Sequence, residues 1–454
     1  MENKLIFNYI VKEEIMKFIK NEEEFLNFFS SSLYDKIVKE STIKINRNVD
    51  KKEYKEIILR LYDELNNYEY RTDVIDEKLF TYKTNNVARI IPILSIKDEL
   101  LYYFVCKMLE DEIAINRTEN TYGGWRIGNK IKIEEDAEIE YVYKSYNPTL
   151  WNKNWKEFQN ILFNQIQTLN EDDIILKLDI ANFYDNINLS LLEKKLLVSV
   201  PSEKLEFINM LMYFLRNWNL KNDKYHLKSV GIPQNEFGDQ SRLLANFYLQ
   251  NYDKTVKQIC DISNAIYIRY ADDQIIIVKN IEKLNNIMYV ISRELNCLGL
   301  NLNASKVKKY NKETIQVLYG IPIFKLIDEK KYDEAVDKFF DFYTRKDVDF
   351  NYTSSLKRFL NIGFDKFNIS NRNKLKSIIT EYQFVRESNE YYMKKIYNNL
   401  LEEEKNDFID LIYKISEETT YNSFHYNAIN FLQKIDQKDN IDKIISRIQE
   451  IKTI

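Results

Sequence analysis

One short stretch, residues 266–278, constrains the fold of this chain more than any other. It places Tyr270-Ala271-Asp272-Asp273 between two runs of β-branched and aliphatic residues, which predicts a β-hairpin with two carboxylates at its turn. Strands this apolar are normally buried, and adjacent Asp side chains at a buried tip repel each other unless a cation or a partner neutralises them. Asp is also common in ordinary turns, so two interpretations of this hairpin remain: a solvated turn and a metal site.

A second apolar strand delivers another carboxylate. Residues 174–180 read Ile-Ile-Leu-Lys-Leu-Asp-Ile, so that Asp179 stands at the end of a mostly apolar strand. Mg²⁺ prefers hard oxygen ligands such as carboxylates. Polymerases that join nucleotides use two such ions about 3.5–4 Å apart. The two strands therefore predict a two-metal site for nucleotidyl transfer, with Asp179 and Asp272 as ligands.

Further motifs follow in the order found in the reverse transcriptase family. They are Arg89-Ile90-Ile91-Pro92, residues 122–126, residues 179–184, Gly231-Ile232-Pro233-Gln234 with Ser241, the Asp272 hairpin, residues 298–303 with Lys306, and residues 317–320. The sequence resembles that family over residues 80–325. The resemblance implies an α+β fold: a right-hand polymerase with fingers and palm, followed by an all-α, repeat-like C-terminal domain.

The resemblance also implies how metal is bound. Asp179, Asp272 and Asp273 would be the catalytic residues, with Asp179 and Asp272 as principal ligands of two Mg²⁺ ions, for which Mn²⁺ is an alternative. The backbone carbonyl of Ile180 would complete a site, and Asp273 would assist.

Five further residues are candidates for contacts with the incoming nucleotide. Tyr184 occupies the family's position for an aromatic gate that excludes a 2′ hydroxyl, although a core tyrosine is the alternative. Gln234 is expected to reach the base or sugar, and Arg89 and Arg126 to clamp the triphosphate. Lys306 is positioned to protonate the pyrophosphate leaving group, unless it belongs to a solvated basic edge.

One residue departs from the family pattern. Asn235 stands where the family typically has Gly, which lets backbone approach the nucleotide without a Cβ. Asn is the residue that best tolerates a left-handed conformation in place of Gly. Because Glu236 and Asp239 also follow close to the nucleotide pocket, we expect unusual handling of template and substrate.

Composition describes a globular chain of 454 residues, with 44% hydrophobic and 30% charged side chains. The formal net charge of −4 gives no overall positive field for binding nucleic acid, although local basic stretches such as residues 306–309 remain. Cys106, Cys260 and Cys297 are well separated, as is typical of buried thiols in a reducing cytoplasm. No apolar run approaches the ~20 residues of a membrane span. We therefore expect a cytoplasmic protein with no membrane contact.

Changes in composition and periodicity along the sequence predict three domains: a helical N-terminal extension to the fingers (1–75), the fingers and palm (76–325) and an α-helical C-terminal domain (326–454). In the last of these, amphipathic segments recur at Tyr332–Tyr343, Leu356–Phe367, Leu375–Phe384, Tyr391–Leu401, Phe408–Ile415 and Tyr426–Ile435. Stacked helices are the expected result.

This long helical tail resembles that of abortive-infection (Abi) and unknown-group reverse transcriptases. The resemblance implies an RNA-directed DNA polymerase acting in bacterial antiphage defence, with dNTPs, an RNA template or noncoding RNA, and a DNA product as partners. A homo-oligomer is also expected. Three alternatives stay open: template-independent synthesis in which the DNA is covalently linked to the protein, a retron-type or intron-type enzyme, and a catalytically silent RNA-binding scaffold.

Overall fold

The computed structural model describes residues 22–75, 77–83, 87–131, 140–146, 150–219, 231–279, 281–345, 349–437 and 441–453. The fold is helix-rich α+β and divides into two compact units. Unit 1 comprises Met1–Lys78 and Pro92–Lys309, and unit 2 comprises Leu79–Ile91 and Tyr310–Ile454. The boundary at Lys309 lies upstream of the predicted one at residue 325, and the three-domain division drawn from the sequence stays a prediction.

Unit 1 contains the N-terminal helices and a sheet with its surrounding helices. Its helices are α2 (Glu22–Phe28), α3 (Ser31–Tyr34), the π-helix η2 (Asp35–Lys39), α4 (Lys51–Asn66), α5 (Ile96–Met108), α6 (Glu110–Ala114), α7 (Leu150–Gln167), α8 (Leu189–Ser199), α9 (Leu205–Asn217), α10 (Asp239–Tyr248), α11 (Gln250–Ile262) and α12 (Leu284–Cys297). Short 3₁₀ turns are η4 (Tyr184–Asn186), η5 (Ser202–Lys204), η6 (Ile281–Lys283) and η7 (Ala304–Lys306).

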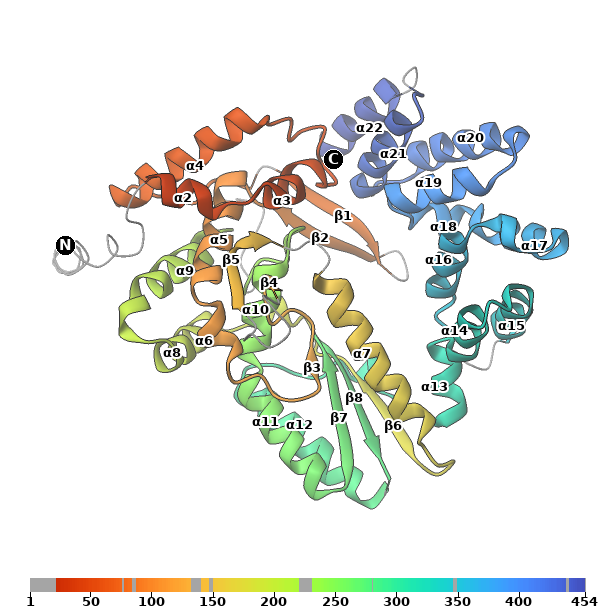
Figure 1. Ribbon diagram of the computed structural model, residues 1–454, viewed down its shortest axis with the longest axis horizontal. Coiled ribbons are helices and arrows are strands. Elements are labelled where there is room, and N and C mark those ends of the chain that lie inside the picture. The colour runs from red at the N-terminus through yellow and green to blue at the C-terminus, as the bar shows by residue number, and fades with distance from the viewer. Residues whose placement is uncertain are drawn as a thin grey trace. The chain divides into compact units, whose positions relative to one another are not determined.

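A five-stranded sheet is the centre of unit 1 (Figure 1). Its strands are β3 (Thr121–Tyr122), β6 (Ile174–Leu178), β7 (Ala265–Tyr270), β8 (Asp273–Val278) and β9 (Lys308–Tyr310), in the order β3-β7-β8-β6-β9. β7 and β8 are antiparallel and form the hairpin predicted from the sequence, and β6 pairs antiparallel with β8. A separate two-stranded sheet pairs β4 (Gly128–Ile131) with β5 (Glu140–Tyr146).

The helices of unit 1 bury the apolar faces that their periodicity predicts. α4 begins at Asp50, whose carboxylate accepts hydrogen bonds from the N–H groups of Lys52 and Glu53 at 2.8 and 2.9 Å. Its buried residues recur at three- and four-residue steps, from Ile58 to Leu65. These residues join one hydrophobic core that extends from the N-terminal helices through α5, α9 and α10 to the sheet. Such a continuous core holds the turn between β7 and β8 in a fixed place.

Unit 2 is a succession of helices, and described residues from 311 onward form no strand. The helices are α13 (Lys312–Leu318), α14 (Ile321–Asp328), α15 (Tyr332–Thr344), α16 (Tyr352–Ile362), η8 (Phe364–Lys366), α17 (Ile369–Ile379), α18 (Tyr382–Arg386), α19 (Glu390–Asn399), α20 (Glu402–Glu418), α21 (Asn422–Lys434) and α22 (Ile441–Thr453). The predicted segment Leu356–Phe367 is interrupted because Gly363 adopts φ +94°, which ends α16. The predicted segment Leu375–Phe384 is likewise divided between α17 and α18.

A β-hairpin far upstream in sequence completes unit 2. It pairs β1 (Glu77–Lys83) with β2 (Val87–Ile93). The Phe80 N–H donates to Asn422 Oδ1 at 2.7 Å, and the Ser423 hydroxyl donates to the Phe80 carbonyl at 2.8 Å. Helix α21 therefore satisfies both backbone groups of one residue in β1, and the C-terminal helices do not form a purely helical unit.

Two further expectations can be compared with the described residues. No helix among them combines the length and apolar character that crossing a membrane needs. Cys106 and Cys260 are buried as expected, but Cys297 is exposed because it lies at the end of α12, so the expectation of three buried thiols was wrong.

Candidate active site

Strand pairing brings the predicted carboxylates to one end of the sheet. β6 and β8 pair with Leu178 opposite Gln274, so the next residue of β6, Asp179, comes level with Asp273. β7 and β8 pair up to Tyr270 and Asp273, which leaves a two-residue turn that contains Asp272. Strand pairing therefore brings Asp179 close to Asp272 and Asp273, which lie more than 90 residues further along the sequence.

The charges of these carboxylates interact, and two lysines offset them. Burial raises the pKa of Asp272, the negative charges of Asp273 and Asp179 raise it further, and Lys306 opposes this rise. Lys306 Nζ lies 3.0 Å from both carboxylate oxygens of Asp179, and Lys177 Nζ lies 3.4 Å from Asp273 Oδ1. The strands of the hairpin are therefore buried while its turn is half-buried, and lysine charges offset those of the carboxylates.

Asp179 is held by the segment that precedes Lys306. The Asn303 N–H donates to the Asp179 carbonyl at 2.8 Å, and the Ala181 N–H donates to the Asn301 carbonyl at 2.9 Å. Asn303 Nδ2 also lies 3.3 Å from Asp179 Oδ2. The first two of these hydrogen bonds lie on either side of the Ile180–Leu302 bridge, and their acceptors are the Asp179 and Asn301 carbonyls. The Ile180 carbonyl is not an acceptor in either of them.

The donor set can be compared with the needs of a divalent cation. Asp179 is 8% exposed, and its neighbour Asp272 carries a carboxylate that burial destabilises in its charged form. Hard oxygen donors with surplus negative charge suit Mg²⁺ or Mn²⁺. The described residues contain no cluster of three or more His, Cys, Asp or Glu side chains arranged for a metal. The residues present therefore fit a site built on two carboxylates, not an assembled triad.

The predicted gate residue, Tyr184, packs against the loop that carries Gln234. The Ile232 N–H donates to the Tyr184 carbonyl at 3.1 Å. Gly231 has φ +46°, and a Cβ there would lie 2.2 Å from the Tyr184 carbonyl oxygen. Glycine is therefore required at this position, for conformation and for space. Tyr184 and Gln234 are both half-buried, and their contacts with a nucleotide stay a prediction.

Asn235 does not adopt the left-handed conformation that asparagine tolerates. Its φ is not positive, and the left-handed positions in this loop are Gly231 and Gly238. Asn235 is buried, and its Nδ2 donates to both carboxylate oxygens of Glu99 at 2.7 and 2.9 Å. Burial raises the pKa of Glu99 to about 7. The Asn235 amide thus connects the loop to a buried acid of α5.

The two predicted triphosphate-binding arginines lie in different surroundings. Arg126 forms an ion pair with Asp111 of α6. Arg89 lies on β2 within unit 2, is exposed, and its carbonyl accepts a hydrogen bond from the Thr81 hydroxyl at 3.3 Å. A role in nucleotide binding stays a prediction for both residues.

Residues that sequence reasoning missed lie directly behind the turn. Arg269 of β7 is fully buried and forms a bidentate ion pair with Asp253 of α11, at 2.8 and 2.6 Å. Burial disfavours the charge of Arg269, but Asp253 more than compensates, so the pKa of Arg269 is raised. An arginine at an inward position of an otherwise apolar strand is the sequence signal that could have drawn attention to it.

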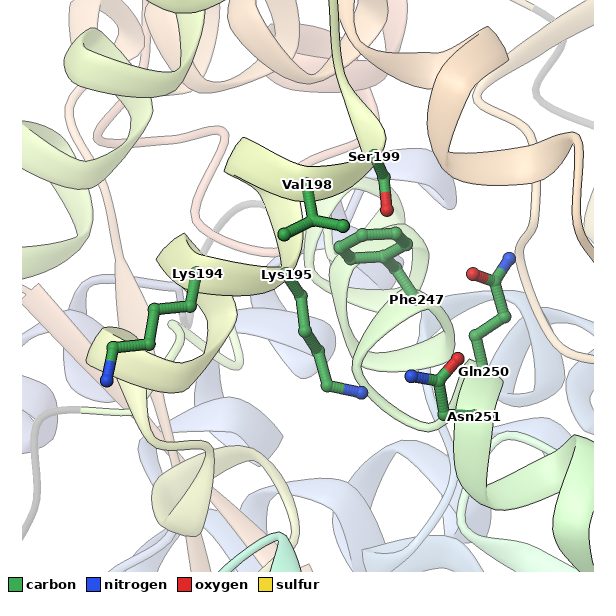
Figure 2. Close-up of a pocket in the computed structure, with 7 residues that line it drawn as sticks. All are labelled: Lys194, Lys195, Val198, Ser199, Phe247, Gln250 and Asn251. Carbon is green, nitrogen blue, oxygen red and sulfur yellow. The ribbon is translucent and has the colours of Figure 1, made fainter.

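A separate pocket of about 260 Å³ lies between α8 and the junction of α10 with α11. Figure 2 shows Lys195 pointing into it toward Asn251, while Lys194 points away. Lys195 Nζ donates to the Tyr248 carbonyl at 2.8 Å, and burial lowers the pKa of Lys195. None of the residues predicted from the sequence lines this pocket.

One segment of the chain matches a known family. Residues 129–323 match a family model described as reverse transcriptase (RNA-dependent DNA polymerase). The matched segment includes Asp179, Asp272, Asp273 and Lys306, so the carboxylates of the candidate site lie in the part of the chain that is similar to this domain. A search of curated proteins found no match.

Several solved structures of telomerase are similar to this chain at low identity. Apo telomerase from Candida tropicalis, truncated from the C-terminal domain, is 14% identical, with 50% of this chain and 48% of that chain covered and a TM-score of 0.33. Telomerase from Candida albicans in complex with the TWJ fragment of telomeric RNA is 12% identical, with 86% and 67% covered and a TM-score of 0.34. This chain spans about half the length of the first structure.

Proposed function

We propose that this protein is an RNA-directed DNA polymerase that joins dNTPs by metal-assisted nucleotidyl transfer. One observation carries the proposal: Asp179 and Asp272 come from different strands of a reverse transcriptase domain and are gathered where their charges interact. An isolated structural turn has no need of this concentration of negative charge. Binding a divalent cation gives it a chemical use.

The metal ligands of this proposal are Asp179 and Asp272, with the Ile180 carbonyl completing the set and Asp273 assisting. When bound, two Mg²⁺ or Mn²⁺ ions supply activation of the attacking 3′ hydroxyl and offset the charge of the triphosphate. Lys306 lies against Asp179 and holds a positive charge there. We propose that it moves to the pyrophosphate and donates a proton, a step typically worth about 10²–10⁴-fold in rate.

The remaining predicted residues would select and orient the nucleotide. The Tyr184 ring would exclude a 2′ hydroxyl and so favour deoxynucleotides, with Gln234 in the adjacent loop contacting the base or sugar. Arg89 and Arg126 would bind the triphosphate through bidentate hydrogen bonds, for which Arg126 has to leave Asp111.

The cellular role belongs to the same proposal. The helical tail of over 120 residues supports membership of the bacterial defence-associated (Abi and unknown-group) reverse transcriptases, acting in the cytoplasm on phage infection. An RNA template or a noncoding RNA would be the nucleic-acid partner, and a homo-oligomer the assembled form. The DNA product would be free or, in protein-primed synthesis, covalently linked to the chain.

A DNA-synthesis assay tests the polymerase proposal. Purified protein is incubated with Mg²⁺ and labelled dNTPs, with and without RNA template, and the product is resolved before and after protease digestion. Asp272→Asn keeps the shape of the side chain and removes its charge, so we expect loss of synthesis. Asp261→Asn on α11, an exposed carboxylate paired with Lys257, is the matched control and should retain activity.

Each result of this assay has a distinct meaning. Free product that requires RNA supports templated reverse transcription, whereas label that stays with protein until digestion and ignores RNA supports protein-primed, template-independent synthesis. Absence of product with the wild-type chain under every condition would overturn the polymerase proposal in favour of an RNA-binding scaffold.

For the cellular role, a bacterial strain that expresses the protein should reduce phage plating, and Asp272→Asn should abolish that protection.

A further inference from the structure

Four donated hydrogen bonds use the guanidinium of Arg269. Nε and Nη2 reach the two carboxylate oxygens of Asp253, at 2.8 and 2.6 Å. Nη1 donates to Asn246 Oδ1 at 2.8 Å and to the Ala271 carbonyl at 2.7 Å. Arg269 and Asp253 are each 0% exposed. A single buried side chain thus connects α10, α11 and the backbone of the turn that carries Asp272.

The backbone of this turn needs external support. Ala271 has φ +53°, a conformation that residues other than glycine rarely adopt unless their surroundings impose it. Its carbonyl is bound by Arg269, and its N–H donates to the Tyr122 carbonyl at 3.1 Å. A Cβ on Gly123 would lie 2.6 Å from the Ala271 nitrogen, so the segment at residues 120–123 also packs closely on the turn.

The hydrogen bonds around Arg269 also reach the segment at residues 120–123. Asn246 Nδ2 donates to the Gly123 carbonyl at 3.0 Å while its Oδ1 accepts from Arg269. The Arg269 N–H donates to the Asn120 carbonyl at 3.0 Å. The Ala271 carbonyl is therefore bound by Arg269 itself. The segment that accepts the Ala271 N–H is held by the Arg269 N–H and by Asn246, which also binds the Arg269 guanidinium.

From this geometry we infer that Arg269 is a positioning residue, which holds Ala271 in its left-handed conformation and thereby fixes the direction of the Asp272 carboxylate. The Asp253 carboxylate and the Asn246 amide orient the guanidinium so that Nη1 faces the Ala271 carbonyl. Lysine cannot replace it, because one ammonium cannot satisfy Asp253 in bidentate fashion and reach Asn246 and Ala271 together. The inference rests on the proposed function for the catalytic meaning of the turn.

Hydrogen exchange measured by mass spectrometry on the full chain tests the inference without any DNA synthesis. In Arg269→Lys, the Ala271 amide should exchange at least about tenfold faster relative to the amides of β6, which serve as an internal reference. Asn246→Ala, which keeps the Arg269–Asp253 pair, should also accelerate exchange at Ala271 and provides the test if Arg269→Lys does not fold. Unchanged relative exchange at Ala271 in the folded variants would overturn the inference.

The matched control is Tyr267→Phe. The Tyr267 hydroxyl donates to Asp253 Oδ1 at 2.7 Å within the same buried cluster but does not contact the turn. This variant should lose global stability and leave the relative exchange of Ala271 within about twofold of wild type. Equal acceleration in Tyr267→Phe and Arg269→Lys would show that the cluster contributes only to the core, and would overturn the positioning role.

A kinetic measurement separates this inference from the proposed function. In Arg269→Lys, kcat should fall about 10–100-fold with the dNTP KM little changed, and the Mg²⁺ concentration for half-maximal activity should rise, because the misdirected carboxylate is a metal ligand. A normal Mg²⁺ dependence with a raised dNTP KM would contradict positioning of Asp272. Inactive wild-type protein would overturn the proposed function, and hydrogen exchange would then decide the role of Arg269 alone.

Discussion

Replacing Gly231 by Ala should damage the candidate active site more than the same replacement at another left-handed glycine. Gly231 has φ +46°, and a Cβ there would lie 2.2 Å from the Tyr184 carbonyl oxygen and 2.7 Å from the Asp185 Cα. Gly299 has φ +72° and no atom within 4 Å of its Cβ position. The pair therefore separates conformational cost, present at both positions, from steric overlap, present only at Gly231.

The magnitudes follow from these two contributions. A left-handed conformation costs a residue with a Cβ about 1–2 kcal/mol. Overlap with backbone that cannot rotate away adds about 1–3 kcal/mol in tightly packed regions. We expect Gly299→Ala to lower the free energy of unfolding by about 1–2 kcal/mol and Gly231→Ala by about 2–5 kcal/mol. Because the displaced atoms belong to the turn that carries Tyr184, a shift near 1 Å should also lower kcat/KM by roughly 10²-fold.

Urea unfolding and steady-state dNTP incorporation measure the two effects. The midpoint and slope of unfolding give the stability of each variant, and incorporation is compared under conditions where all variants stay folded. Gly299→Ala should retain most of its activity. Equal stability and equal activity of the two variants would refute the reasoning, because the contact with Tyr184 would then have no energetic effect.

Three further predictions concern separate parts of the chain. Tyr184→Val should raise rNTP incorporation relative to dNTP by roughly tenfold or more, whereas Tyr184→Phe, which keeps the ring, should not; equal discrimination in both would remove the gate role. Burial raises the pKa of Glu99 from 4.5 to about 7, so the native state binds this proton more tightly and stability falls as the pH rises from about 4.5 to 7. Urea unfolding at pH 5 and pH 8 should show that fall reduced by about 3 kcal/mol in Glu99→Gln, and an unchanged fall would contradict the assignment. Asn422→Ala leaves the Phe80 N–H without its acceptor, so limited proteolysis should cleave the β1–β2 hairpin roughly tenfold faster, and cleavage at the wild-type rate would show that the contact is dispensable.

Strand pairing illustrates how much of the site could be predicted from the sequence. Apolar runs around Asp179 and Asp272 and the two-residue turn are local patterns, and alternation and turn chemistry act over a few residues. Because short apolar strands that end in Asp can pair at one sheet edge, their convergence was predictable in outline. The structure added the register that brings Asp179 level with Asp273, and the lysines that offset the charges.

Contacts between distant segments could not be predicted in the same way. The partners of Arg269 and Asn235 lie on helices α11 and α5. Nothing in the local sequence around either residue indicates that Asp253 or Glu99 is its partner. Asn235 illustrates this, because asparagine tolerates a left-handed conformation but here has an ordinary φ and binds the buried Glu99.

Local sequence patterns were enough to predict the main elements and the chemistry they carry: the buried hairpin, the carboxylates at its turn and the amphipathic helices that follow residue 310. Periodicity and turn propensity are properties of neighbouring residues, so they are legible without a structure. Only the tertiary structure decided that β1 and β2 belong with α21, and that a buried arginine supports the Ala271 peptide. Those facts depend on which distant surfaces meet, and that is settled by the packing of the whole chain rather than by any one segment.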